Sequence, residues 1–112
     1  YYSDLTGKPG AVEEIGTFAP SYCAEKEKAE FLRNAMFNAW AHNSEYFLWW
    51  CGFDQSNLAF PPYTWSAWER ELGFFTPEFE EKPIAKTFRD FRAFLDALPR
   101  NSRPSAATQS AC

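Results

Sequence analysis

The segment that decides the fold runs from Glu45 to Phe53 and reads EYFLWWCGF. It is a nearly continuous apolar run with no 3.6-residue period, and it is too short for a full helix. A continuous apolar strand is typical of a parallel sheet whose two faces are both covered. The segment therefore predicts a buried strand in an α/β fold.

A second strand is predicted upstream, from Ala11 to Gly16 (AVEEIG), where the glycine ends a run of strand length. Side chains alternate along a strand, so Glu13 and Glu14 should point to opposite faces and only one can enter a cleft. Two interpretations stay open. The acids are solvated at a strand end, or one is a functional carboxylate at the carboxyl end of a parallel strand, where α/β enzymes place their active sites.

Helical periodicity follows each of the two strands. Apolar residues recur on one face from Ala24 to His42, and Pro83 opens a second amphipathic helix that reaches Leu98. We interpret the charged run from Glu25 to Glu30 as a solvated helix face. The order strand, helix, strand, loop, helix predicts two parallel strands joined by a right-handed crossover. Because two strands alone make a poor sheet, we expect further strands to be missing from this chain.

Residues 54–82 form a long excursion rich in Pro, Asn, Tyr and Trp. Within it, Tyr63 to Leu72 is expected to form a short helix that Gly73 terminates. A loop of roughly 30 residues in a compact domain is usually functional or misread. The first seven residues are expected to form a turn, and the polar tail 100–112 is expected to be disordered.

Composition excludes several classes of partner. The 112 residues carry a formal charge of -4, which argues against nucleic acid and against an anionic membrane surface. No apolar run reaches the length of a membrane span. Three cysteines and one histidine form no disulfide framework, no metal-ligand spacing and no cofactor motif, so no metal or cofactor is expected. The chain begins with Tyr1, and we expect it to be excised, processed or a fragment.

Aromatic residues make up 20% of the chain and must be buried or displayed to a ligand. Trp49 and Trp50 end the predicted strand, so alternation sends one ring into the core and the other to the mouth of the sheet. A flat ring suits the C–H patches of a pyranose, while the sugar hydroxyls seek polar side chains. The sugar-binding candidates are Trp50, Trp49, Asp54, Tyr63 and Trp65.

Two other reactive side chains have structural interpretations. His42 lies at a predicted helix end without the partners that a metal site or a catalytic triad needs, so we interpret it as a hydrogen-bonding residue. Cys51 within the strand is interpreted as a small buried hydrophobe.

Three segments together resemble one enzyme family. Gly7-Lys8-Pro9 leading into Val12 to Gly16 is similar to the seventh strand of clan A glycoside hydrolases, the family 5 cellulase and mannanase relatives. Leu48 to Cys51, followed by Asp54, resembles the eighth strand with its sugar-stacking tryptophan. Within the excursion, the segment that leads into the final barrel helix is resembled by Pro62-Tyr63, Glu69 to Gly73 and Lys82-Pro83. The resemblance covers residues 7–98.

The resemblance implies an α/β fold, the C-terminal βαβα portion of a (β/α)8 TIM barrel: strand 7, helix 7, strand 8, a long loop and helix 8, over residues 1–99. It implies that Glu14, directly before Ile15-Gly16, is the catalytic nucleophile, and that Trp50 is the stacking ring with Trp49 second. Ile15 replaces the aromatic residue often found there. The family's Asn-Glu pair, whose glutamate is the acid/base, is absent from this sequence. The isolated chain is therefore expected to be inactive.

Three functions remain as hypotheses. The first is part of a retaining glycoside hydrolase for β-linked glycans, with a carbohydrate substrate and the rest of the barrel as its partners. The alternative is a non-catalytic carbohydrate-binding or interaction module that uses Trp50, Trp65 and Trp68. The third is a scaffold piece that completes a barrel with another chain.

Overall fold

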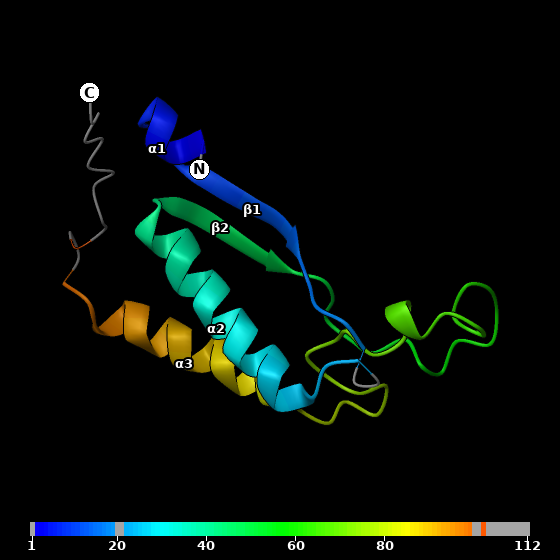
Figure 1. Ribbon diagram of the computed structural model, residues 1–112. Helices are drawn as coiled ribbons and strands as arrows, with labels where there is room; N and C mark the ends of the chain where they lie inside the picture. The colour runs from blue at the N-terminus through cyan, green and yellow to red at the C-terminus, as the bar shows by residue number, and fades with distance from the viewer. Residues whose placement is uncertain (1, 20–21, 100–101, 103–112) are drawn as a thin grey trace.

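The computed structural model of the protein describes residues 2–19, 22–99 and 102, and its sheet consists of two parallel strands. These are β1 (Gly10–Ile15) and β2 (Ser44–Trp49), which lie side by side in Figure 1. The apolar segment EYFLWW is therefore a strand, as predicted. It ends at Trp49 rather than at Phe53, because Phe53 leaves the sheet and bridges to Phe75.

Two helices cover one face of this sheet. The chain passes from β1 through α2 (Glu25–Ala41) to β2, and α3 (Pro83–Ala97) follows the long excursion. Both helices run opposite to the strands in Figure 1, as the colour order along the chain shows. This βαβα order confirms the predicted α/β arrangement of parallel strands and crossover helix. The shared core contains Leu32, Met36 and Ile84, with Phe47, Trp49, Phe74, Phe88 and Phe91 packed against it.

The two faces of β2 differ in their surroundings. Phe47 and Trp49 pack against the helix core and are half-buried, as strand alternation requires. Tyr46 and Leu48 point the other way and are 64% and 57% exposed. We predicted a strand covered on both faces; within the described residues only the helix side is covered. We refer to the side that carries Tyr46 and Leu48 as the open face.

A β-bulge interrupts β1 at its two glutamates. Val12 pairs with Phe47 and Ile15 pairs with Trp49, so Glu13 and Glu14 lie opposite the single residue between those partners. An extra residue of this kind resets the alternation of side chains along the strand. Both glutamates are exposed while Val12 and Ile15 are half-buried. The regular alternation that we predicted across Glu13 and Glu14 is therefore wrong.

Two local predictions also differ from the structure. The chain begins with a short helix, α1 (Tyr2–Thr6), where a turn was predicted, and Ser3 Oγ donates to the His42 carbonyl at 2.6 Å. The helix expected over residues 63–72 is reduced to the single 3₁₀ turn η1 (Ala67–Glu69). The Arg70 carbonyl accepts from the Gln55 amide at 2.7 Å and not from an amide of a longer helix.

The remaining expectations concern the tail, membranes and metals. Residues 100–112, apart from Ser102, lie outside the described residues. Over the part of the chain that the structure describes, no helix is long and apolar enough to cross a membrane. In the same part, no group of three or more His, Cys, Asp or Glu side chains is arranged to hold a metal ion.

Candidate functional site

The candidate site lies at the carboxyl ends of the two strands, from which the connections 16–24 and 50–82 leave (Figure 1). The strands remain paired up to this edge, because the Trp50 amide donates to the Ile15 carbonyl at 2.7 Å. A Cβ atom on Gly16 would lie 3.0 Å from the Trp50 carbonyl oxygen. The glycine thus permits the close approach that brings the end of β1 beside Trp50.

Glu14 stands at this edge with its side chain exposed. Among the described residues, neither Glu14 nor Glu13 makes a hydrogen bond or ion pair to another side chain. A carboxylate in this position is solvated and open to a ligand that approaches the carboxyl ends of the strands. Its role as nucleophile stays a prediction.

Trp49 and Trp50 have different surroundings. Trp49 is half-buried against the helix core, its Nε1 donates to the Leu72 carbonyl at 2.9 Å, and its ring stacks on Phe74 at 5.9 Å. Trp50 follows β2 and is 43% exposed, and its peptide bond to Cys51 is cis. The predicted division of the pair into one core ring and one open ring is therefore confirmed. Sugar stacking by either ring stays a prediction.

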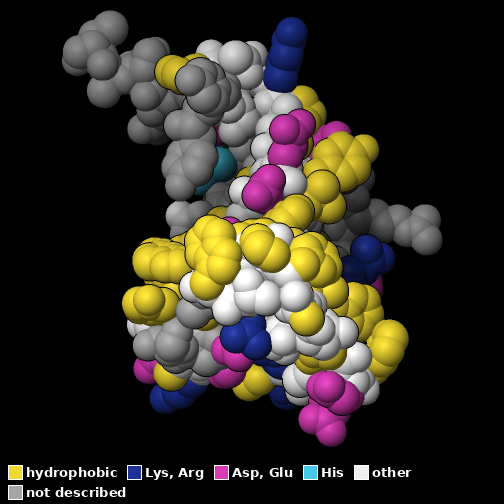
Figure 2. Space-filling view, turned by 90° about the vertical axis from the view of Figure 1, so that its right-hand side faces the viewer, with side chains coloured by type: hydrophobic (Ala, Val, Ile, Leu, Met, Phe, Trp, Pro, Cys, Tyr) yellow, Lys and Arg dark blue, Asp and Glu magenta, His cyan; other side chains and the backbone are white. Residues whose placement is uncertain are grey.

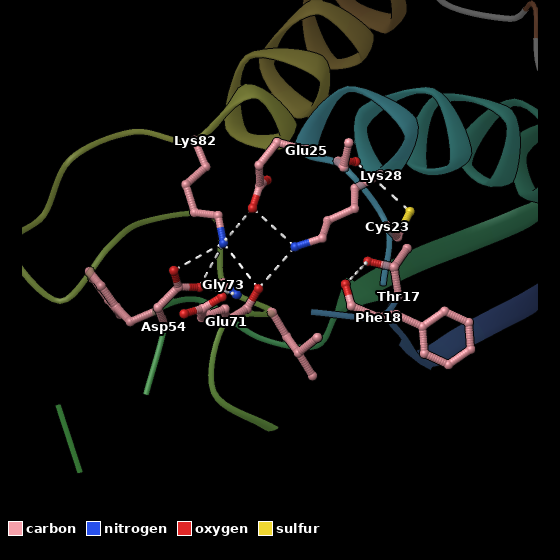
Figure 3. A network of polar contacts seen from close by, with 12 residues as sticks. Thr17, Phe18, Cys23, Glu25, Lys28, Asp54, Glu71, Gly73 and Lys82 are labelled. Atoms are coloured by element: carbon pink, nitrogen blue, oxygen red, sulfur yellow. Dashed lines mark hydrogen bonds and ion pairs between the residues drawn. The ribbon is translucent and has the colours of Figure 1, made fainter. Parts of the chain in front are cut away.

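Asp54 is buried at the start of the long connection (Figure 3). Its Oδ1 and Oδ2 accept from Lys82 Nζ at 2.8 and 3.0 Å, and Oδ1 also accepts from the Gly73 amide at 2.7 Å. A Cβ atom on Gly73 would lie 2.3 Å from the backbone of Phe53 and of Asp54, so only glycine fits there. These contacts hold the connection in place; substrate binding by Asp54 stays a prediction.

A second lysine extends this buried network toward α2. Lys28 is fully buried, and its Nζ lies 3.0 Å from Glu25 Oε1 and 3.1 Å from the Glu71 carbonyl. Lys82 Nζ contacts the same two oxygens, each at 3.1 Å (Figure 3). The interpretation of this helix segment as fully solvated is wrong for Lys28. Its position four residues before Leu32, on the apolar face, was the signal in the sequence.

Several aromatic residues of the long connection are exposed. Trp65 is 74% exposed, and Tyr63 is half-buried with its ring edge-on to Phe60 at 5.4 Å. Trp68 is 48% exposed and contacts two rings of the other connection, Phe18 and Tyr22, which we did not single out from the sequence. Figure 2 shows hydrophobic side chains gathered over this end of the molecule.

His42 has the hydrogen-bonding role expected of it, whereas Cys51 is half-buried rather than buried as predicted, and its Sγ donates to the Phe53 carbonyl at 3.0 Å. Burial raises the pKa of the half-buried Cys51 thiol, and the nearby Asp54 carboxylate raises it further, so the thiolate nucleophile is disfavoured. His42 follows α2, and its Nδ1 lies 2.6 Å from Asp4 Oδ2. This pair lies beside the start of β2, at the opposite end of the sheet from Glu14.

Comparison with solved structures relates this fold to one enzyme family. A glutamate-to-alanine variant of the GH5_18 enzyme from Streptomyces cattleya, in complex with Manβ1-4GlcNAc, matches with a TM-score of 0.66 and 24% identity. That match covers 83% of this chain and 22% of the enzyme. The chain matches part of a family 5 glycoside hydrolase. Together with the two further matches at 25% and 26% identity, this match confirms the predicted resemblance to this family.

Two further family 5 structures agree. GH5_18 from Bifidobacterium longum subsp. longum matches with a TM-score of 0.66 and 25% identity, over 88% of this chain and 24% of that enzyme. A glutamate-to-alanine variant from the same organism, in complex with Manβ1-4GlcNAc, matches with a TM-score of 0.67 and 26% identity. That match covers 88% of this chain and 25% of the enzyme. The chain thus spans about a quarter of the length of the enzymes it matches. No family model and no curated protein matches the sequence.

Proposed function

We propose that residues 1–99 are part of a retaining glycoside hydrolase barrel, in which they form strands 7 and 8 with their helices. Glu14 supplies the nucleophile and Trp50 the ring on which the reacting sugar stacks. The observation that carries the proposal is the placement of an exposed carboxylate and an exposed indole at the carboxyl ends of two paired parallel strands. Barrel enzymes assemble their active sites at this end of their strands.

The proposed substrates are β-linked glycans, and β-mannosides in particular. Two of the matched family 5 enzymes were solved in complex with Manβ1-4GlcNAc, a neutral disaccharide. The exposed rings at the strand ends fit such a ligand, because the C–H face of a pyranose lies well on an aromatic plane.

The proposed reaction has two steps. Glu14 attacks the anomeric carbon and forms a glycosyl-enzyme ester, while a second carboxyl group about 5–5.5 Å away protonates the departing oxygen. Water then hydrolyses the ester, with the second carboxylate as its base, so the anomeric configuration is retained. We assign that second carboxyl group to a part of the protein outside this chain, and we therefore propose that this chain alone does not hydrolyse glycosides.

The test compares the two neighbouring glutamates in the full-length protein. We expect Glu14→Gln to lower kcat for a β-mannoside by about a thousandfold or more, because an amide cannot form the ester. Glu13→Gln is the matched control, because it removes the same negative charge from the neighbouring residue of the same bulge. This variant should retain activity. Azide added to Glu14→Ala should restore turnover and yield the α-glycosyl azide. Near-normal turnover of Glu14→Gln would refute the assignment.

A second candidate function is a non-catalytic carbohydrate-binding module. The exposure of Trp50, Trp65 and Trp68, all on or next to one connection, favours it. This function predicts that the 112-residue chain binds oligosaccharides by itself and that Glu14→Gln leaves the binding unchanged. Calorimetric titration of the chain with a β-linked mannan oligosaccharide separates the two functions.

A further inference from the structure

We propose that Asp54 is a positioning residue for the reaction, because it holds the backbone that follows Trp50 and so sets the place of the indole. The Asp54 carboxylate, the Gly73 amide and the Lys82 ammonium group bond to one another, and we name them the polar anchor. The inference rests on the proposed function, which assigns the stacking ring to Trp50. It goes beyond that function by giving Asp54 a role in the reaction without contact to the substrate.

The Trp50 indole depends on its backbone for its place at the end of β2. Among the described residues it makes no contact with another aromatic ring, whereas the rings of Trp49 and Trp68 each do. The Trp50 amide donates to the Ile15 carbonyl at 2.7 Å, and Gly16 leaves room for the Trp50 carbonyl. These contacts hold the residue on its upstream side only. The chain downstream must fix the other side.

Downstream of Trp50, the chain is tied to a later segment of the same connection. The carbonyl of Cys51, the next residue, accepts from the Phe74 amide at 3.2 Å. Three residues further on, the Asp54 amide donates to the Phe75 carbonyl at 2.8 Å. Because the two segments are bonded at both points, a displacement of the later segment moves the residues that follow Trp50.

The polar anchor fixes the later segment through buried side chains. Asp54 Oδ1 accepts from the Gly73 amide at 2.7 Å and from Lys82 Nζ at 2.8 Å, as Figure 3 shows. Asp54 and Lys82 are 9% and 8% exposed, so water competes weakly for these groups and the bonds between them are strengthened. A buried carboxylate whose oxygens are already bonded is poorly placed to bind a sugar hydroxyl. Asp54 therefore acts on the reaction through Trp50.

A double-mutant cycle in the full-length protein tests this role. Wild type, Asp54→Asn, Trp50→Ala and the double variant are assayed on Manβ1-4GlcNAc. Asp54→Asn keeps an oxygen for the Gly73 amide but loses the charge that pairs with Lys82. We expect kcat/KM to fall by about thirtyfold in Trp50→Ala and by about fivefold in Asp54→Asn. In the Trp50→Ala background, Asp54→Asn should lower kcat/KM by less than about twofold, because the ring that it positions is gone.

Two further variants complete the test. Lys82→Gln, which can still donate to Asp54, is carried through the same cycle with the same outcome expected, so the test does not depend on the folding of one variant. Ile84→Ala is the control for lost stability, since Ile84 is fully buried in the helix core two residues after Lys82. At a temperature at which circular dichroism shows every variant folded, Ile84→Ala should keep kcat/KM within about twofold of wild type.

Three results would overturn the positioning role and leave the proposed function standing. They are losses that add fully in the double variant, no loss in Asp54→Asn, or an equal loss in Asp54→Asn and Ile84→Ala. The first would mean that Asp54 acts separately from Trp50, as a residue in contact with substrate does. A Trp50→Ala protein with wild-type kcat/KM, or a wild type that does not hydrolyse Manβ1-4GlcNAc, would overturn the proposed function, and the positioning role with it.

Discussion

The helix-covered half of the molecule and the connection 50–82 are held by different forces. In the first, α2 and α3 lay apolar stripes on the sheet, and the core residues Leu32, Met36 and Ile84 are almost fully buried. In the second, the only regular structure among the described residues is η1, and the backbone is fixed by buried ion pairs such as Lys82 with Asp54. The first half is encoded by a repeating pattern, whereas the second depends on single residues, such as Lys82 and Asp54, whose partners are distant in the sequence.

This difference explains why the connection can display so many rings. A segment without helix or strand must satisfy its backbone through other contacts. Lys28 and Lys82 do so at the Glu71 carbonyl, and Asp54 does so at the Gly73 amide. Phe74 packs against the helix core, but because polar contacts also fix this backbone, Trp65 and Trp68 are not needed as anchors and stay exposed.

The largest expected effect comes from breaking the polar anchor. We expect Lys82→Met in the full-length protein to lower the free energy of unfolding by about 3–5 kcal/mol, because it leaves the buried Asp54 carboxylate without its cation. Lys86→Met on the same helix is the control. Lys86 pairs with Asp90 on the surface, both side chains more than half exposed, so its loss should cost less than about 1 kcal/mol. Urea denaturation measures both, and equal effects would contradict the anchor.

A cavity in the helix-covered half should lower the free energy of unfolding by somewhat less than the loss of the Lys82 cation. Ile84 is fully buried, so Ile84→Ala removes apolar contacts and leaves a void, and we expect a loss of about 3 kcal/mol in the free energy of unfolding.

Limited proteolysis adds the contrast between the two regions. Lys82→Met should expose the connection 50–82 to cleavage first, whereas Ile84→Ala should not favour that region. The same cleavage pattern in both variants would show that the two regions are not held separately.

The smallest effect tests the close approach at Gly73. Gly73→Ala places a methyl group against the backbone of Phe53 and Asp54, and we expect a loss of about 2 kcal/mol. Gly52→Ala is the control, because a Cβ atom there meets nothing within 4 Å. Thermal unfolding of both variants measures the difference. A Gly73→Ala protein as stable as Gly52→Ala would refute the tight packing of this turn.

The regular elements of the fold were predictable from the sequence. The predicted helix from Ala24 to His42 matches α2 (Glu25–Ala41), and the helix opened by Pro83 matches α3, each within one residue at either end. Both are set by local rules, an apolar period and a terminating signal. Gly16 predicted the end of β1 at Ile15, and alternation predicted that one of Trp49 and Trp50 lies in the core, although it left open which one.

The features that shape the candidate site were not predictable from local patterns. The bulge at Glu13 and Glu14 depends on the register with β2, which only pairing defines. The position of Lys28 on the apolar face of α2 is a local signal, but its partner, the Glu71 carbonyl, lies 43 positions away. The ring contact between Tyr22 and Trp68 likewise joins separate connections. Each is a partnership between distant residues, and no window of sequence contains both members.

If the proposed glycan site lies at this edge of the sheet, the bulge affects which sugars it would admit. Because the extra residue leaves both glutamates exposed, two negative charges stand side by side where a regular strand would present one. A uronic acid or a sulfated sugar placed there would meet like charges on adjacent residues, whereas a neutral hexose would not. In the proposed glycan site, the insertion of one residue into a strand would therefore disfavour acidic polysaccharides by charge repulsion.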